Sequence, residues 1–255
     1  MNAPKISIIT ITYNSEATIT ATLNSIREQS FQEFEYIVID GASTDKTVSI
    51  IENHPIRVSY ITSEPDKGLY DALNKGIRLA TGEVIGVLHS DDIFFSKDSL
   101  HRISDVFDAG AEACYGDLQY VVVNNSPSES RIVRHWVAGE FKRNNLRYGW
   151  MPPHPTFYMK RKLFEKFGDY DSSFKIAGDY DGLLRFLWKN EVVPTYIPEV
   201  LVRMSVGGAS NRSLKNIYNK TLEDIRALKN NGLAWLPAIL LKNLSKIPQF
   251  FIRPF

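Results

Sequence analysis

The alternation of strand and helix patterns over the first 92 residues is the feature that most constrains the fold of this chain. Short β-rich segments at 5–12, 34–39, 56–61 and 84–91 are separated by three segments with apolar residues at helical spacing. Parallel neighbouring strands need a crossover connection between them, usually a helix, and such crossovers are almost always right-handed. The alternation therefore predicts a parallel βαβ sheet covered by helices on both faces.

After residue 92 this rhythm loosens, and the patterns predict a mixed α/β arrangement. Strand patterns follow at 113–123, 131–137, 156–159, 192–197 and 201–206, and helix patterns at 97–107, 161–167, 178–190 and 212–231. The strand at 131–137 is expected to return antiparallel to the strand at 113–123, because the turn-forming run NNSPSES separates them. We expect one α/β domain over residues 1–211, followed by a helical tail over 212–255.

Composition excludes several classes of protein. The chain has 255 residues, 44% of them hydrophobic, which is enough to bury the core of one large domain. Its 30 basic and 29 acidic residues nearly cancel, so nucleic-acid binding is not expected. The single Cys114 excludes an internal disulfide and the cysteine-rich zinc patterns, and its apolar neighbours predict a buried thiol in a reducing compartment. Neither a leader peptide nor a membrane-spanning run is predicted, since the longest apolar stretch is Leu233–Leu241.

The run from Val84 to Asp92 carries the most chemistry. A buried apolar strand pattern ends in Ser90 and the adjacent carboxylates Asp91 and Asp92. Ligands of open α/β sheets bind at the carboxyl ends of the strands, and carboxylate oxygens there suit Mg²⁺ or Mn²⁺ holding a diphosphate. The alternative is a solvated strand-to-helix turn with no ligand.

Polar residues follow two further strand ends, in Thr12-Tyr13-Asn14 and in Asp40-Gly41-Ala42-Ser43-Thr44-Asp45. Together with residues 90–92, these segments resemble the family 2 glycosyltransferases, which have the GT-A fold, and the resemblance extends from residue 5 to about 211. The segment 64–76, EPDKGLYDALNKG, resembles the members that build bacterial colanic acid, O-antigen or other exopolysaccharides. The resemblance implies a nucleotide-binding half at 1–92 and an acceptor-binding half at 93–211.

The nucleotide-sugar donor would be bound by residues that this resemblance identifies. Tyr13 offers an aromatic face for the base. Asp40 matches the family residue that accepts the uracil N3 proton, which favours UDP or dTDP over CDP. Further contacts to base, ribose or phosphate are expected from Thr12, Asn14, Glu16, Asp45, Asp71, Asn74 and His89. The alternative for several of them is a role as a helix cap or turn residue.

The metal site and the catalytic base are implied by two acidic motifs. The family's Asp-x-Asp pattern aligns with His89 and Asp91, so Asp91 is the expected ligand of Mg²⁺ or Mn²⁺ and His89 departs from the pattern. Asp92 would orient Asp91 or contact the diphosphate or acceptor. The motif beginning Gly178-Asp179 resembles the family's catalytic acid motif, and Asp179 would take the acceptor proton, with inversion at the sugar carbon. The alternative is that Asp179 only caps its helix; Asp181 points away and is a weaker candidate.

Other polar residues of the second half are candidates for acceptor or diphosphate contacts. They are His154, held between prolines, Arg203, Arg212, and Ser210 in a glycine-containing flap. The alternative for His154 is a structural role.

The tail predicts contact with a membrane surface. Leu236, Leu240, Leu244 and Ile247 share one helical face, with Lys242 and Lys246 on a separate flank. Such a helix fits the membrane interface, although it could instead pack on the enzyme or on a second subunit of a homo-oligomer. We expect a cytoplasmic enzyme, peripheral on the inner membrane, with a polyprenyl-diphosphate-linked glycan as acceptor.

The prediction is therefore an inverting, metal-dependent glycosyltransferase of the hexosyltransferase type. One alternative is a sugar nucleotidyltransferase, which needs a basic glycine-rich loop that residues 10–13 do not contain. The other is a non-catalytic nucleotide-sugar-binding protein.

Overall fold

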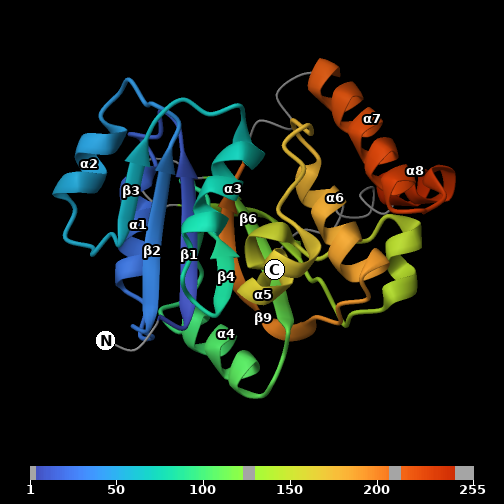
Figure 1. Cartoon of the computed structure of the whole chain (residues 1–255), viewed down its shortest axis with the longest axis horizontal. Helices are drawn as coiled ribbons and strands as arrows, with labels where there is room; N and C mark the ends of the chain where they lie inside the picture. Colours follow the sequence, from blue (N-terminus) through green and yellow to red (C-terminus); the bar gives the residue numbers. More distant parts are fainter. Residues whose placement is uncertain (1–3, 123–129, 207–213, 245–255) are drawn as a thin grey trace.

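The computed structural model describes residues 4–122, 130–206 and 214–244. One nine-stranded sheet runs through the molecule in the order β3-β2-β1-β4-β8-β6-β9-β5, and β7 pairs with β6 (Figure 1). The strands are β1 (Ile6–Thr12), β2 (Phe34–Asp40), β3 (Tyr60–Ser63), β4 (Val84–Val87), β5 (Asp92–Phe94), β6 (Ala113–Val122), β7 (Arg131–Trp136), β8 (Tyr158–Lys160) and β9 (Thr195–Ser205). The α-helices are α1 (Ile19–Arg27), α2 (Thr47–Asn53), α3 (Leu69–Leu79), α4 (Ser99–Asp108), α5 (Arg161–Phe167), α6 (Gly178–Leu184), α7 (Leu214–Asn230) and α8 (Trp235–Leu244).

The first four strands form the predicted parallel sheet. Its register pairs Thr12 with Asp40 and Asp40 with Ser63, so these strand ends lie at one edge. Two boundaries were predicted wrongly. β3 begins at Tyr60 rather than residue 56, because Ile56 enters the core from the loop after α2. β4 ends at Val87, so the acidic pair lies in the turn before β5 and at the start of β5 itself.

The second half completes the sheet with mixed strand directions. β8 lies antiparallel between β4 and β6, and β7 returns antiparallel along β6 as predicted. The two strands predicted at 192–197 and 201–206 are one strand, β9. Its register against β6 shifts near Pro198, which has no backbone N–H for the ladder. The helix predicted over 178–190 ends at Leu184 and continues as the π-helix η4 (Arg185–Lys189).

The sheet buries both of its faces, which explains the continuous apolar runs in its parallel strands. In β1, Ile9 and Ile11 face the core formed with α3, α5 and α6, whereas Ile6 and Ile8 face the core formed with α1, α2 and α4. Gly86 of β4 lets the antiparallel strand β8 approach, because an added Cβ would lie 1.9 Å from Cε1 of Tyr158. Cys114 is buried as predicted, and burial raises the pKa of its thiol.

Helices α7 and α8 form a hairpin beside α6 (Figure 1). Ala238 of α8 is fully buried, and Lys242 points inward, where its Nζ lies 3.1 Å from Asp224 Oδ2 and 3.6 Å from the Tyr180 ring centroid. Lys242 lies apart from the exposed Leu236 and Leu240, as predicted, but its charge is paired inside the protein and does not face a membrane surface. Among the described residues, no helix is long and apolar enough to cross a bilayer.

Candidate active site

The loop after β2 surrounds Asp40 with donors. Asp40 is fully buried, and its Oδ2 accepts hydrogen bonds from the Ser43 N–H at 2.8 Å and the Ser63 hydroxyl at 2.6 Å. Tyr13 is 63% exposed beside this loop, and a Cβ added at Gly41 would lie 3.5 Å from its ring. The same Cβ would lie 3.0 Å from Oδ2 of Asp66, which was not among the predicted site residues. The sequence signal that could have identified Asp66 is its position in the motif at 64–76.

The turns after β1 and β2 are interlocked by their own polar groups. The Thr44 N–H donates to Asn14 Oδ1 at 2.8 Å, and the Glu16 N–H donates to Asp45 Oδ2 at 3.1 Å. Asp45 also accepts the Thr47 N–H at 2.9 Å, at the start of α2. These contacts fit the capping and turn roles, and Asn14 adopts a left-handed backbone (φ 50°) within them. Ligand contacts from these residues stay a prediction.

Two further candidates for binding the nucleotide-sugar donor lie on α3, and both have partners within the protein. Asp71 Oδ2 accepts the Lys67 N–H at 3.0 Å in the first turn of the helix. Asn74 is buried, and its side-chain amide makes two hydrogen bonds, at 2.7 and 2.9 Å, with the backbone of Tyr170. Asn74 therefore joins the two halves of the domain, whatever further role it has in binding.

The acidic pair divides into one accessible and one buried carboxylate. Asp91 is half-buried, and its carbonyl oxygen accepts the Ser205 hydroxyl at 2.7 Å. Asp92 is buried; its Oδ1 accepts the Ser205 N–H at 3.3 Å, and its Oδ2 has no hydrogen-bond partner. Burial, and then the neighbouring charge of Asp91, raise the pKa of Asp92 well above its usual range. Thr12, at the end of β1, also has a buried hydroxyl without a partner.

Asp179 lies in the first turn of α6. Its Oδ1 accepts the Tyr180 N–H at 2.8 Å and lies 3.3 Å from the Tyr70 hydroxyl. Gly178 packs directly on the Tyr70 ring, where an added Cβ would come within 2.7 Å of Cε2. Asp181 is buried and its Oδ1 accepts a hydrogen bond from Asn231 at 3.1 Å, which agrees with its weaker candidacy.

Both carboxylates act on one imidazole. Burial lowers the pKa of His89, and the charges of Asp91 and Asp179 oppose that change, so both acids lie within electrostatic reach of this ring. The His89 and His154 ring centroids are 6.3 Å apart, and His154 Nε2 is hydrogen-bonded to the Tyr170 hydroxyl at 2.8 Å. Burial lowers the pKa of His154 to about 4. Two acids that are 88 residues apart in the sequence therefore both act electrostatically on His89.

Of the remaining candidate residues, one has partners within the protein and the others lie outside the described residues. The Arg203 Nε donates to Gln119 Oε1 at 3.3 Å, and its guanidinium lies 4.8 Å from the Phe95 ring centroid. Ser210, the flap around it and Arg212 lie outside the described residues.

The donor chemistry around the acidic pair suits a divalent cation. The described part of the chain contains no group of three or more His, Cys, Asp or Glu side chains that could enclose a metal by itself. Asp91 and the unpartnered Oδ2 of Asp92 nonetheless offer oxygen ligands, which hard cations such as Mg²⁺ and Mn²⁺ prefer. Mg²⁺ is commonly held by one or two carboxylates plus substrate phosphates, so Asp91, alone or with Asp92, is sufficient on the protein side.

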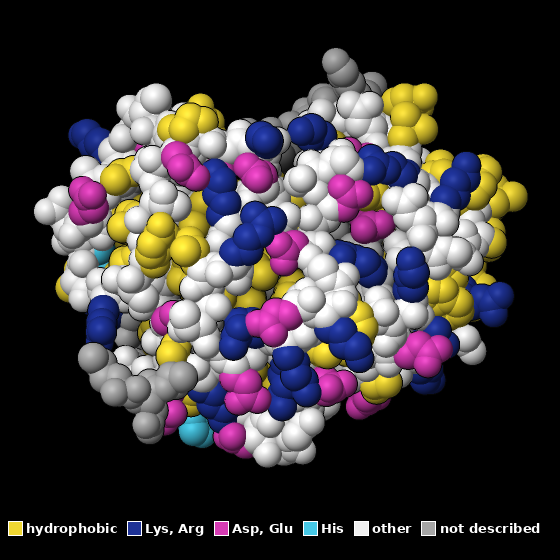
Figure 2. All heavy atoms as spheres, viewed as in Figure 1, with side chains coloured by type: hydrophobic (Ala, Val, Ile, Leu, Met, Phe, Trp, Pro, Cys, Tyr) yellow, Lys and Arg dark blue, Asp and Glu magenta, His cyan; other side chains and the backbone are white. Residues whose placement is uncertain are grey.

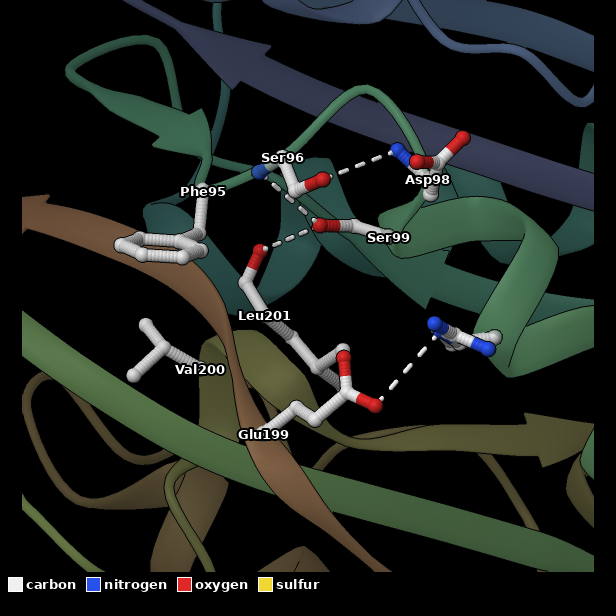
Figure 3. Close-up of a pocket in the computed structure, with 8 residues that line it drawn as sticks. Phe95, Ser96, Asp98, Ser99, Glu199, Val200 and Leu201 are labelled. Carbon is white, nitrogen blue, oxygen red and sulfur yellow. Dashed lines mark hydrogen bonds and ion pairs between the residues drawn. The ribbon is translucent and has the colours of Figure 1, made fainter.

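A separate groove of about 270 Å³ lies between the start of α4 and β9 (Figure 3). Its polar groups are paired with one another: Arg102 Nε lies 3.5 Å from Glu199 Oε1, and the Ser99 hydroxyl donates to the Leu201 carbonyl at 3.2 Å. None of the predicted site residues lines it, so we do not assign it to the active site.

Known proteins share the sequence pattern or the fold of this chain. A PGL/p-HBAD biosynthesis glycosyltransferase of Mycobacterium bovis is 30% identical over 226 residues, spanning 87% of this chain and 85% of that protein. The crystal structure of S. aureus TarS 1–349 matches with a TM-score of 0.69 and 21% identity, over 98% of this chain and 75% of that one. The mannosyltransferase PcManGT from Pyrobaculum calidifontis, solved with GDP-Man and Mn²⁺, matches with a TM-score of 0.60 and 19% identity. That match covers 99% of this chain and 76% of the other.

The structural matches confirm the GT-A fold, and the sequence matches identify the family. The model of the family described as Glycosyl transferase family 2 covers residues 7–176, about two-thirds of the chain. Taken with the acidic motifs at the sheet edge, this match shows that the chain is a glycosyltransferase and belongs to glycosyl transferase family 2.

Proposed function

We propose that this enzyme transfers one sugar, with inversion, from a nucleotide-sugar donor to an acceptor hydroxyl. The observation that supports the proposal is that the charges of Asp91 and Asp179 both act on the buried His89 imidazole, where they oppose the lowering of its pKa by burial. In the reaction, the acceptor oxygen bonds to sugar C1 as the bond from C1 to the diphosphate oxygen breaks on the opposite face. Asp179 takes the acceptor proton, and the nucleoside diphosphate carries away the electron pair. Asp91, with Asp92 behind it, would hold a divalent cation that neutralises charge on the leaving diphosphate.

A UDP-type donor is favoured by the surface beside Tyr13. The exposed ring offers a stacking face for a base. Asp40 remains the predicted partner of uracil N3, but its oxygens already accept hydrogen bonds from Ser43 and Ser63. Asp66, beside the same ring, is a second carboxylate able to accept a base N–H.

Two variants test the roles of the acids. Asp179→Asn should abolish UDP release from a UDP-sugar while UDP binding in the presence of Mn²⁺ survives in calorimetry. Asp91→Ala should instead lose the part of UDP affinity that Mn²⁺ provides. Asp105→Asn, which changes an exposed acid on α4, is the matched control and should behave as wild type.

A panel of UDP- and GDP-sugars, with membrane extract as acceptor, identifies the donor. Wild-type activity retained in both Asp179→Asn and Asp91→Ala would contradict the proposal. Binding of UDP without release from any donor would favour the non-catalytic alternative.

We also propose a lipid-linked acceptor, presented at the inner membrane surface during assembly of a surface polysaccharide of the colanic acid or O-antigen kind. The outer face of the α7–α8 hairpin supports this location. Leu236 and Leu240 of α8 are 54% and 55% exposed, across the helix from the buried Ala238, and Leu241 on its flank is 42% exposed. Hydrophobic side chains gather at the edge of the molecule that α7 and α8 form (Figure 2).

The charge of the C-terminal region fits an anionic surface. Residues 214–255 contain seven Lys and Arg but only two acids, Glu223 and Asp224. Both acids have internal partners: Glu223 accepts backbone N–H groups and Asp224 pairs with Lys220 and Lys242. An apolar face in a basic region without free acids is typical of interfacial helices.

Vesicle flotation tests this surface. Wild type should float with vesicles containing phosphatidylglycerol and less with pure phosphatidylcholine, and the double change Leu236→Ser with Leu240→Ser should abolish flotation. Val193→Ser removes an apolar side chain that is 69% exposed elsewhere and should have no effect. If the double variant floats like wild type, Leu236 and Leu240 do not form the membrane-binding surface. Loss of a dimer in that variant would instead favour packing against a second subunit.

A further inference from the structure

A carboxylate from α7 binds the backbone that leads into the catalytic helix. Glu223 Oε1 accepts the Lys175 N–H at 2.9 Å, and its Oε2 accepts the N–H groups of Ile176 and Ala177, each at 2.8 Å. Three consecutive backbone donors thus share one side chain that is 46 or more residues away in the sequence. Asp179 follows this segment after one residue, Gly178.

The same segment is held from its other side by α3. The Tyr70 hydroxyl donates to the Ile176 carbonyl at 2.8 Å, and Lys175 Nζ donates to the Lys67 carbonyl at 3.2 Å. Gly178 has no room for a side chain because the Tyr70 ring occupies that space. The backbone before Asp179 is therefore fixed between α3 and α7, and Asp179, in the first turn of α6, follows its placement.

We propose that Glu223 is a positioning residue for the transfer reaction, acting by fixing the backbone of residues 175–177 and through it the carboxylate of Asp179. The inference rests on the proposed role of Asp179 as the base. A general base works only within hydrogen-bond reach of the proton it takes, and a displacement of about 1 Å can cost about 100-fold in rate. Glu223 contacts no part of the predicted donor site, so its loss should change turnover and leave donor affinity intact.

The neighbouring acid on α7 provides a matched control. Asp224 pairs with Lys220 at 2.9 Å and with Lys242 at 3.1 Å, so it holds the hairpin together and binds none of the backbone at 175–177. Removing Asp224 loosens the hairpin, whereas removing Glu223 releases the segment before Asp179. The two substitutions therefore separate general destabilisation from loss of positioning.

The experiment compares Glu223→Gln, Glu223→Ala and Asp224→Asn with wild type, using UDP release and calorimetry with UDP and Mn²⁺. We expect kcat to fall about 100-fold in Glu223→Ala, with donor KM and UDP affinity within about twofold of wild type. Glu223→Gln keeps one oxygen that can accept from the Ile176 and Ala177 N–H groups, but it places an NH₂ group against the Lys175 N–H. We therefore expect kcat to fall about tenfold. Asp224→Asn should lower the melting temperature and keep kcat within about twofold.

Amide hydrogen exchange gives a readout that does not depend on activity. Exchange at residues 175–177 should accelerate in Glu223→Ala and stay at the wild-type rate in Asp224→Asn. An unchanged kcat or unchanged exchange in Glu223→Ala overturns the positioning role, as does an equal loss of kcat in Asp224→Asn. Wild-type protein that releases no UDP from any donor overturns the proposed function and the positioning role of Glu223 together.

Discussion

The folded protein should lose stability through His154 as the pH falls. This imidazole is buried, and burial lowers its pKa from 6.5 to about 4. The unfolded chain therefore binds the proton more readily than the folded one between these two values. The contribution of His154 to stability is complete above pH 6.5 and is lost progressively as the pH falls toward 4.

The size of the effect follows from the two pKa values. At pH 5 the difference in proton binding amounts to about 2 kcal/mol of unfolding free energy, and at pH 7.5 to almost nothing. Other groups also titrate over this range, so the quantity to measure is the difference between wild type and His154→Gln, which cannot take up the proton.

Urea unfolding at pH 7.5 and pH 5.0 measures this difference. The unfolding free energy of wild type should fall by about 2 kcal/mol more than that of His154→Gln over this interval. Equal falls in the two proteins would refute the argument that His154 is held neutral by burial.

Three further predictions concern packing and ligand contact. Gly86→Ala places a Cβ against the Tyr158 ring and should cost about 1–3 kcal/mol of unfolding free energy by urea denaturation; wild-type stability would contradict the close approach of β8. Asn74→Leu leaves the backbone N–H and carbonyl of Tyr170 unpaired and should cost about 2–4 kcal/mol, and a neutral result would mean that this link between the halves is dispensable. Tyr13→Ser should weaken UDP binding about tenfold in calorimetry with little change in melting temperature, whereas unchanged affinity would exclude stacking of the base on this exposed ring.

The fold was largely predictable because its signals are local. Helix α5 has the predicted bounds, and β1, β2 and β6 begin and end within about a residue of prediction, since periodicity and flanking turn residues define them. β9 was predicted as two strands because the polar and proline-containing interval at 198–200 looks like a turn in sequence. In the structure, pairing with β6 continues on both sides of that interval with a shifted register, so the chain passes through it as one strand.

The site was predictable as a set of residue types and less so as a set of contacts. Asp91, Asp179 and His154 were selected from short motifs; in the structure the two acids act electrostatically on His89, and the His154 ring lies 6.3 Å from it. Glu223 could not be selected, because a single acid on a polar helix carries no pattern that distinguishes it from a solvated residue. Its three backbone partners become visible only when α7 lies against the segment before α6.

The sequence by itself determined the parallel half of the sheet, and it predicted the edge for ligand binding and the residue types proposed for a metal, a base and a stacking face. These follow from periodicity and short motifs, which act over a few residues. The tertiary structure decided that Asp92 is buried, that Lys242 points inward and that Asn74 binds the backbone of Tyr170. Burial and pairing depend on which surfaces meet, and Asn74 meets a partner 96 residues away, beyond the reach of any local pattern.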